Sequence, residues 1–196
     1  MINYINENFF NHRFVISRLD IGTQTYILNK FIGKSILHIG CVDSLCYNKD
    51  HNLHIKLAPK CQMLHGFDID KKGLEILNTD CPSTYFTNLS DVYKYTYDVV
   101  LIPEVIEHVD NVGEFIKNMA KINTKEYFIT APDISLYNTN IKNTSNYIHE
   151  SIHSDHKYWF SPYTLYNVCN PLISKITSTD SCEMLLLNGS ISLHIK

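Results

Sequence analysis

Arginine is scarce in this sequence, and positive charge is not in excess. Arginine occurs only as Arg13 and Arg18, and the 17 lysine and arginine residues are outnumbered by 20 acidic ones, which gives a formal net charge of −3. Because affinity for nucleic acid comes largely from neutralising phosphates, this balance argues against a non-specific nucleic-acid binder. We therefore do not expect a nucleic-acid partner, although a local basic patch is compatible with these totals.

Closely spaced cysteines, a leader sequence and a long apolar run are also missing. None of the 6 cysteines forms a C-x-x-C pair, the spacing typical of zinc and redox sites. The first residues lack the basic-then-apolar order of a secretory signal, and no apolar run reaches the about 18 residues of a membrane span. A chain of 196 residues can bury a core without disulfides. These absences predict a cytoplasmic protein with reduced thiols and no membrane partner.

The length of 196 residues predicts a single domain over residues 1–196. Apolar residues at helical spacing predict a helical lead-in over residues 1–33, which ends at Gly33. Residues 133–158 are polar and irregular, which is typical of a functional lid, and we expect them to cover the acceptor. Nothing in the sequence indicates an oligomeric state.

Short apolar runs alternate with helical patterns along the chain. Strands are predicted at residues 35–39, 62–67, 83–86, 97–102, 127–130 (broken by Ala131-Pro132), 173–178 and 184–195, with a turn at Asn188-Gly189. Helices are predicted at residues 71–77 (capped by Asp70), 112–122 and 161–168, with a shorter one within residues 41–60. This alternation predicts an α/β fold with a mostly parallel sheet.

Three segments near the ends of predicted strands carry chemistry. Gly40 follows the first strand, where a glycine lets the backbone approach a ligand closely. Asp68 follows the second strand, and an acid at this place can accept hydrogen bonds from both ribose hydroxyls. Residues 98–108, DVVLIPEVIEH, run from the fourth strand into a predicted helix that carries glutamate and histidine. Together these segments fit one cofactor at the carboxyl edge of the sheet.

The order of these segments resembles class I S-adenosylmethionine-dependent methyltransferases of the ubiquinone-biosynthesis O-methyltransferase type. Those enzymes carry a strand-glycine-cysteine motif, a strand-Asp-Ile motif and a D-V-V-x-x-x-E-V-I-E-H-V motif, and the similarity covers residues 34–133. Residues 104–109 match the third motif continuously, and residues 156–165 (HKYWFSPYTL) resemble a W-F-S-P-x-T-L segment of some members. The resemblance implies a Rossmann-like, doubly wound, mostly parallel seven-stranded sheet with an antiparallel C-terminal strand, and S-adenosylmethionine as cofactor.

The resemblance also implies which residues bind the cofactor. Gly40 is expected to face its methionine part, Asp68 to hold the ribose and Ile69 to pack on the adenine. Asn88 and Leu89 stand where the family places an acid and a small residue near the adenine, so Asn88 replaces the acid. The full expected set is Gly40, Cys41, Asp68, Ile69, Asn88, Leu89 and Pro103.

The first motif departs from the family's G-x-G-x-G pattern. Two glycines are missing from the segment Gly40-Cys41-Val42-Asp43-Ser44. Gly40 and Asp68 are also further apart than the ~20 residues of a minimal unit, which indicates an insertion before the second strand. The departure leaves open a catalytically degenerate methyltransferase fold that serves as a binding protein.

Glu104, Glu107 and His108 would share one face of a helix, and two carboxylates with an imidazole suit Mg²⁺, Mn²⁺ or Zn²⁺. The pattern resembles small-RNA 2′-O-methyltransferases, which have a Glu-x-x-Glu-His helix and a later Asp-His-Lys segment, here residues 155–157. That resemblance implies a divalent ion bound by Glu104, Glu107, His108 and His156. Without a metal, His108, Glu104 or His156 would orient the acceptor or remove its proton. In another interpretation, His153 and His156 are lid residues without a catalytic role.

The expected reaction is methyl transfer to a hydroxyl of a small, hydroxyl-rich acceptor. A sugar, a nucleotide-linked sugar or a phosphorylated polyol fits the Glu/His site and the polar residues 133–158, and a role in surface-glycan synthesis follows from the W-F-S-P resemblance. The alternative enzyme is an RNA 2′-O-methyltransferase, which would require a basic groove.

Overall fold

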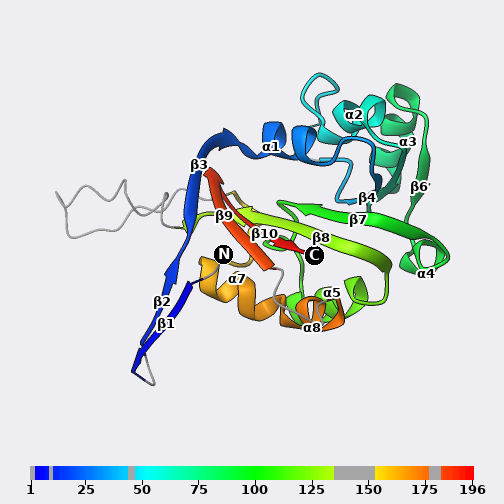
Figure 1. The fold of residues 1–196 in the computed structure, drawn as a ribbon. Helices are drawn as coiled ribbons and strands as arrows, with labels where there is room; N and C mark the ends of the chain where they lie inside the picture. Colours follow the sequence, from blue (N-terminus) through cyan, green and yellow to red (C-terminus); the bar gives the residue numbers. More distant parts are fainter. Residues whose placement is uncertain (1–2, 9–10, 44–46, 135–152, 177–181) are drawn as a thin grey trace.

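The computed structural model describes residues 3–8, 11–43, 47–134, 153–176 and 182–196. Its central strands are β3 (Ser17–Gly22), β4 (Ser35–Ile39), β5 (Met63–Phe67), β6 (Thr84–Phe86), β7 (Thr96–Pro103), β8 (Asn123–Pro132), β9 (Cys182–Asn188) and β10 (Ser190–Ile195). They form one eight-stranded sheet in the order β3-β9-β10-β8-β7-β4-β5-β6 (Figure 1). Strand β10 is antiparallel to β8 and β9, and every other pair of neighbours is parallel.

This architecture confirms the predicted Rossmann-like fold. The chain builds β5 and β6 on one side of β4 and then crosses to build β7 and β8 on the other side, so the sheet is doubly wound. Strand β10 is the predicted antiparallel C-terminal strand. The sheet has one strand more than predicted, because β3 pairs in parallel with the edge of β9.

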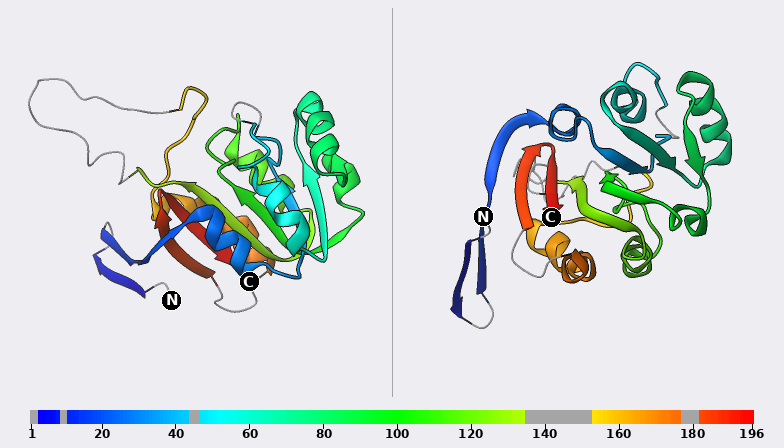
Figure 2. Two further views of the ribbon diagram at one scale, coloured as in Figure 1. Left: turned by 90° about the horizontal axis from the view of Figure 1, so that it is seen from above. Right: turned by 45° about the vertical axis from the view of Figure 1, so that its right-hand side comes forward.

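Helices cover both faces of the sheet. One face is covered by α1 (Thr23–Lys30), α2 (Leu53–Leu57), the 3-10 turn η1 (Ala58–Lys60) and α3 (Lys71–Asp80) (Figures 1 and 2). The other face is covered by α5 (Val112–Met119), α7 (Pro162–Val168) and α8 (Asn170–Ile176). The short helix α4 (Leu89–Val92) follows β6 in the chain. Successive strand residues face opposite layers, so Leu101 packs in the α1–α2 layer and Ile102 in the α5–α8 layer. Burial on both faces explains the continuous apolar runs of the central strands.

Several predicted boundaries are confirmed. Strand β4 spans residues 35–39, and α7 begins at Pro162 after its Ser161 cap. Asp70 caps α3, because its Oδ1 accepts a hydrogen bond from the Gly73 backbone N–H at 3.0 Å. The β9–β10 hairpin turns at Gly189, whose φ of 93° lies in the left-handed region that favours glycine.

The helical lead-in predicted for residues 1–33 is wrong for most of its length. Strands β1 (Asn3–Asn8) and β2 (Asn11–Val15) form an antiparallel hairpin that extends away from the main sheet, and β3 follows (Figures 1 and 2). Of the described residues in this segment, only residues 23–30, in α1, form an α-helix. The pairing of β3 with β9 satisfies part of the backbone of β3, and this tertiary pairing prevails over a weak local helical spacing.

Two predictions near the C-terminal half are also wrong. The strand predicted at residues 173–178 belongs to α8 as far as Ile176, and residues 177–178 lie outside the described residues. The buried residues Cys169, Leu172 and Ile173 have helical spacing. The β-branched residues Ile173 and Ile176 favoured a strand in the sequence pattern and obscured this spacing. Ala131-Pro132 does not break β8, because Pro132 is the last residue of the strand and pairs there with Ser190.

Most of the predicted lid, residues 135–152, lies outside the described residues, so the lid stays a prediction. In the part of the chain that the structure describes, no helix combines the length and the apolar character that crossing a membrane requires.

Candidate functional site

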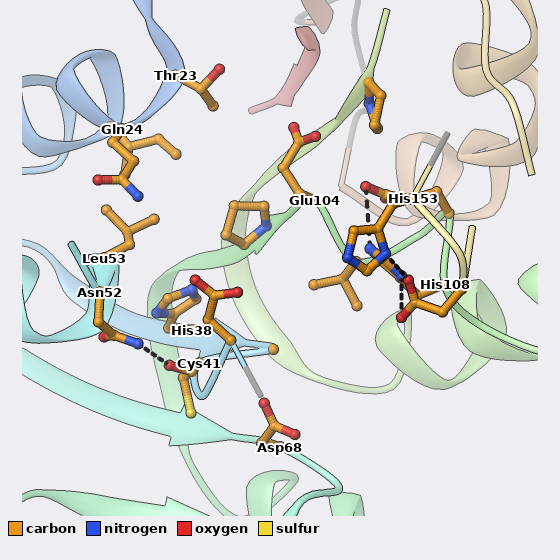
Figure 3. A pocket seen from close by; sticks show the side chains of 18 of the residues that line it. Thr23, Gln24, His38, Cys41, Asn52, Leu53, Asp68, Glu104, His108 and His153 are labelled. Atoms are coloured by element: carbon orange, nitrogen blue, oxygen red, sulfur yellow. Dashed lines mark hydrogen bonds and ion pairs between the residues drawn. The ribbon is translucent and has the colours of Figure 1, made fainter. Parts of the chain in front are cut away.

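A cavity of about 630 Å³ opens at the carboxyl ends of β4, β5 and β7 (Figure 3). Gly40 follows β4, Asp68 follows β5 and Pro103 ends β7, and all three line the cavity. The direction of winding changes between β4 and β7, and open α/β sheets bind ligands in the crevice at such a switch point. The structure therefore brings the three sequence motifs together.

The loop after β4 has a fixed shape although it lacks two glycines of the G-x-G-x-G pattern. Gly40 has a φ of 72°, and a Cβ at this position would lie 2.5 Å from Val105 Cγ2. The side-chain amide of Asn52 donates to the carbonyl oxygens of Cys41 (3.0 Å) and Val42 (3.2 Å). The Val42 backbone N–H donates to Asp68 Oδ2 at 3.0 Å. Side chains from two other segments, Asn52 and Asp68, thus hold this loop.

Asp68 is buried at the cavity wall and already accepts two backbone hydrogen bonds. Its Oδ2 is bonded to Val42 as above, and its Oδ1 accepts from the Asp70 N–H at 3.0 Å. Each carboxylate oxygen has a second lone pair, so acceptor capacity remains for a ligand hydroxyl. Beside it, burial and the Asp68 charge raise the pKa of the Cys41 thiol, which keeps that thiol neutral.

Of the three predicted adenine-binding residues, Ile69 lines the cavity, whereas Asn88 and Leu89 lie elsewhere. Ile69 lines the cavity with 85% of its surface exposed, an unusual exposure for a large apolar side chain. Asn88 and Leu89 are not among the lining residues of the described part of the chain. Asn88 instead caps α4, where its Oδ1 accepts from the Ser90 N–H at 3.1 Å, and Leu89 packs against the core. A contact of these two residues with a ligand stays a prediction.

Residues 104–108 do not form the predicted helix. Glu104 has a φ of 50°, and its N–H donates to the Thr130 carbonyl oxygen at 3.2 Å, which continues the pairing of β7 with β8. A single turn follows, closed by a hydrogen bond of 3.0 Å from the His108 N–H to the Val105 carbonyl oxygen. The next helix, α5, begins only after its Asn111 cap. Attachment to the sheet at Thr130 prevents helical geometry at Glu104.

The turn nevertheless places Glu104, Glu107 and His108 in the same cavity. Glu104 Oε1 accepts a hydrogen bond from the Thr130 hydroxyl at 2.7 Å. Glu107 is fully buried, and neither of its carboxylate oxygens has a hydrogen-bond partner among the described residues. Burial, and then the neighbouring Glu104 charge, raise the pKa of Glu107 to about 8. A carboxylate in this position requires a proton or a cation.

A cluster of three histidines adjoins this carboxylate. His108 Nε2 lies 3.7 Å from Glu107 Oε1, and the rings of His108 and His156 are 4.6 Å apart between centroids. The backbone N–H of Lys157 donates to the Glu107 carbonyl oxygen at 2.8 Å, which ties the later segment to the turn. Burial, followed by the charges of His108 and His153, lowers the pKa of His156. Figure 3 shows His108 and His153 on one side of the cavity, together with Glu104.

Most predicted site residues meet at the cavity, and several lining residues were missed. The predicted residues that line it are Gly40, Cys41, Asp68, Ile69, Pro103, Glu104, Glu107, His108 and His156. The polar lining residues that were not predicted as site residues are Thr23, Gln24, His38, Asp43, Asn52, His153 and Asp155. Thr23 and Gln24 could not be assigned to the site because residues 1–33 were predicted as one helical segment outside the sheet. His153 and Asp155 could have been assigned, because they lie within three residues of the predicted ligand His156.

Of three comparisons with known proteins, only the one with solved structures finds similar proteins, and these share the fold of this chain. No family model matches this sequence, and no curated protein matches it either. Among solved structures, DhpI in complex with SAH is similar with a TM-score of 0.54 and 10% identity over 88% of this chain and 80% of that chain. Magnesium protoporphyrin IX methyltransferase (ChlM) from Synechocystis PCC 6803, with bound SAH, has a TM-score of 0.51 and 17% identity, with the same shares covered. The Pnkp1/Rnl/Hen1 RNA repair complex matches with a TM-score of 0.52 and 17% identity over 88% of this chain and 40% of that chain.

Proposed function

We propose that this protein is a class I S-adenosylmethionine-dependent O-methyltransferase of the cytoplasm that acts on a small, hydroxyl-rich acceptor. One observation carries the proposal: a single cavity joins the Gly40 and Asp68 edge of the sheet to a Glu/His group. Two structures of the same fold, DhpI and ChlM, were solved with SAH, the demethylated form of the cofactor. The proposed acceptors are sugars, nucleotide-linked sugars and phosphorylated polyols, as in surface-glycan synthesis.

The cofactor end of the cavity uses the residues after β4 and β5. Gly40 allows the backbone to lie against the methionine part, Asp68 accepts hydrogen bonds from the ribose hydroxyls, and Ile69 packs on the adenine. The exposure of Ile69 supports this assignment, because a flat apolar ring would cover it. Cys41 and Pro103 complete the wall, and Asn88 and Leu89 are proposed to lie near the adenine.

The reaction centre consists of Glu104, Glu107, His108 and His156. When bound, S-adenosylmethionine supplies a methyl group on a positively charged sulfur. The cofactor would give this methyl group to the acceptor oxygen and keep the electron pair of the broken carbon–sulfur bond on sulfur, and the hydroxyl proton would pass to a base on this chain. Asp155 Oδ2 lies 2.9 Å from His108 Nδ1, and a proton on that nitrogen would leave Nε2 available as the base. Alternatively, the group binds a divalent ion that lowers the pKa of the hydroxyl.

The opposite wall of the cavity carries uncharged polar side chains. Thr23 and Gln24 come from α1 and offer a hydroxyl and an amide, whereas the amide nitrogen of nearby Asn52 is used by the carbonyl oxygens of Cys41 and Val42 (Figure 3). Hydroxyl and amide groups recognise sugar hydroxyls through directional hydrogen bonds, so among the proposed acceptors this wall favours a sugar over the phosphate-bearing ones, which cationic groups would recognise.

RNA 2′-O-methylation is the second candidate. It is favoured by the similarity to the RNA repair complex and by the adjacent glutamates and histidines. The net charge of −3 opposes it, because an RNA duplex binder needs a basic face.

Calorimetry with S-adenosylhomocysteine tests the cofactor assignment. Asp68→Ala should weaken binding by about tenfold or more, because a hydrogen bond to a charged group contributes about 1.5–3 kcal/mol. Asp50→Ala is the matched control, since Asp50 is exposed and outside the cavity lining of the described residues. Thermal unfolding checks that the variant, which also loses the Val42 bond, is folded. Equal affinity of Asp68→Ala and wild type would overturn the assignment.

Transfer of labelled methyl groups to a panel of acceptors tests the reaction. We expect transfer to a sugar, nucleotide-sugar or polyol phosphate and none to a short RNA, and His108→Ala should reduce the rate by about 10²–10⁴-fold. His51→Ala, at an exposed position, is the control. Transfer to RNA alone would replace the first candidate by the second. Binding of S-adenosylhomocysteine without transfer to any acceptor would indicate a degenerate binding protein.

A further inference from the structure

We propose that His153 joins His108 and His156 in a three-imidazole site for a zinc-like divalent ion, with Asp155 as the residue that orients two of the three ligands. The use of this ion in methyl transfer rests on the proposed function, whereas ion binding itself rests on the geometry alone. The proposed ligand set exchanges Glu104, which the sequence favoured, for His153, to which no role was assigned.

The three imidazoles are close enough for one ion. One ligand atom from each of His108, His153 and His156 lies within 4.8 Å of the others. Zinc–nitrogen bonds are about 2.0–2.1 Å long, so two nitrogens on one tetrahedral ion are about 3.4 Å apart. Side-chain rotations that bring the nitrogens about 1–1.5 Å closer therefore close the site, and the exposed position of His153 permits them.

Asp155 lies beside the Nδ1 atoms of two of the rings, where a carboxylate favours the tautomer that metal ligation requires. Its Oδ2 lies 2.9 Å from His108 Nδ1, and its Oδ1 contacts His153 Nδ1. Protons held on Nδ1 leave Nε2 of both rings as lone-pair donors. A carboxylate behind a ligating histidine is the usual arrangement around protein-bound metals, where it fixes ring orientation and raises ligand basicity.

Unpartnered buried atoms point to a cation site at the same place. Within the described residues, His108 Nδ1, His156 Nδ1 and both oxygens of Glu107 are buried and form no hydrogen bond; the 2.9 Å approach of Asp155 to His108 Nδ1 lacks hydrogen-bond geometry. Glu107 Oε1 is 3.7 Å from His108 Nε2, so this carboxylate faces the imidazole cluster and can act as the fourth ligand. Glu104 differs, because its Oε1 accepts a hydrogen bond from Thr130. Leaving buried polar atoms unpaired is unfavourable, and one cation would satisfy the group together.

The ligand chemistry selects the ion. Three nitrogens and one oxygen suit Zn²⁺ or Co²⁺, whereas Mg²⁺ prefers oxygen ligands in an octahedral arrangement and retains its water. The exchange of a glutamate for His153 thus narrows the expected ion from Mg²⁺, Mn²⁺ or Zn²⁺ to a zinc-like one.

Cobalt titration of the tag-free, chelator-treated chain tests the inference without any acceptor. Visible absorption of Co²⁺ should rise to one equivalent, Zn²⁺ should remove the signal stoichiometrically, and a large excess of Mg²⁺ should leave it unchanged. His153→Gln should weaken Co²⁺ binding at least tenfold, and Asp155→Asn by about 10–100-fold, as for other residues behind metal ligands. His51→Gln, an exposed histidine outside the cluster, should bind as wild type does.

Three outcomes would overturn the inference: no Co²⁺ binding at millimolar concentration, equal affinity in His153→Gln and wild type, or displacement of Co²⁺ by Mg²⁺. Thermal unfolding of His153→Gln confirms that a loss of binding is local. Calorimetry with S-adenosylhomocysteine separates the two proposals. Intact cofactor binding without ion binding rejects only this inference, whereas absent cofactor binding rejects the proposed function.

Discussion

Two effects disfavour a side chain at position 40: the positive φ of the backbone and the closeness of Val105. Substitutions at three glycines of this chain separate the energetic costs of these two effects. Gly33 has the same φ of 72° but open space around it, so Gly33→Ala should lose only the about 1–2 kcal/mol of a left-handed residue. Gly40→Ala also meets Val105 Cγ2 at 2.5 Å and should lose about 2–5 kcal/mol. Chemical denaturation measures both values.

Gly113→Ala provides the control for this series. Its Cβ would meet Asn111 Oδ1 at an ordinary 3.5 Å within α5, so stability should rise by up to about 1 kcal/mol. Cofactor affinity should fall in Gly40→Ala alone, because only this glycine lines the cavity among the three. Similar losses for Gly33→Ala and Gly40→Ala would show that the Val105 contact is unimportant.

His54 makes the stability of the fold sensitive to acid. It is buried beside His38, with 3.3 Å between the two Nδ1 atoms, and Tyr85 packs against its ring. Burial, and then the charge of His65, lower the pKa of His54 from 6.5 to about 4. Between these values the unfolded chain binds more protons than the folded chain, so acidification favours unfolding, by roughly 3 kcal/mol over the whole window.

Urea denaturation between pH 7 and pH 4 measures this effect. In His54→Gln the free energy of unfolding should fall less steeply with decreasing pH than in wild type. Some slope should remain, since the pKa of buried His194 is also lowered to about 4. His51→Gln, at an exposed position, should retain the full slope. An unchanged slope in His54→Gln would mean that His54 is protonated in the folded protein.

Individual site residues could be predicted where a motif fixes their place relative to a strand end. Gly40 and Asp68 were found because each directly follows a buried apolar strand. Asn52 could not be found in this way, because its role is to bind the carbonyl oxygens of Cys41 and Val42. These residues precede Asn52 by 11 and 10 positions, and only the folded structure brings them within hydrogen-bond distance. His153 was assigned no role for a related reason: its partner Asp155 matters only through the contact with His108.

At the scale of elements, helix α7 shows how a local signal fixes a boundary. The Ser161 hydroxyl accepts from the Thr164 N–H at 3.3 Å, and the Ser161 N–H donates to Thr164 Oγ1 at 2.9 Å. Ser161→Ala removes this reciprocal cap and should lower the free energy of unfolding by about 0.5–2 kcal/mol. Ser161→Asp keeps an acceptor and should stay close to wild type, as measured by thermal and urea unfolding. If both variants lose the same stability, capping is not the cause.

Elements without such signals were predicted less well. The strands of the core have continuous apolar runs, and they were placed within a few residues. Strand β3 is mostly exposed along its length, and its identity as a strand comes from pairing with β9, more than 160 residues later in the chain. The turn at residues 104–108 has a helix-like sequence, but its bond to Thr130 overrides that preference. Long-range pairing is the information that local patterns lack.

At the scale of the whole molecule, the N-terminal segment divides into a part outside the sheet and a part within it. The β1–β2 hairpin pairs with itself and extends from the body in both views of Figure 2, whereas β3 covers the open edge of β9. Unpaired sheet edges promote association between molecules, so the two parts should respond differently to deletion.

Two truncations test this division. Removal of residues 1–15 leaves β3 in place, and the free energy of unfolding should stay within about 0.5 kcal/mol of wild type. Removal of residues 1–22 exposes the backbone of β9 and withdraws Ile21 from the α1 layer, so this variant should elute as aggregates or higher oligomers. Size-exclusion chromatography and urea unfolding distinguish the two results. Aggregation of the shorter truncation would mean that the hairpin, and not β3, protects the sheet.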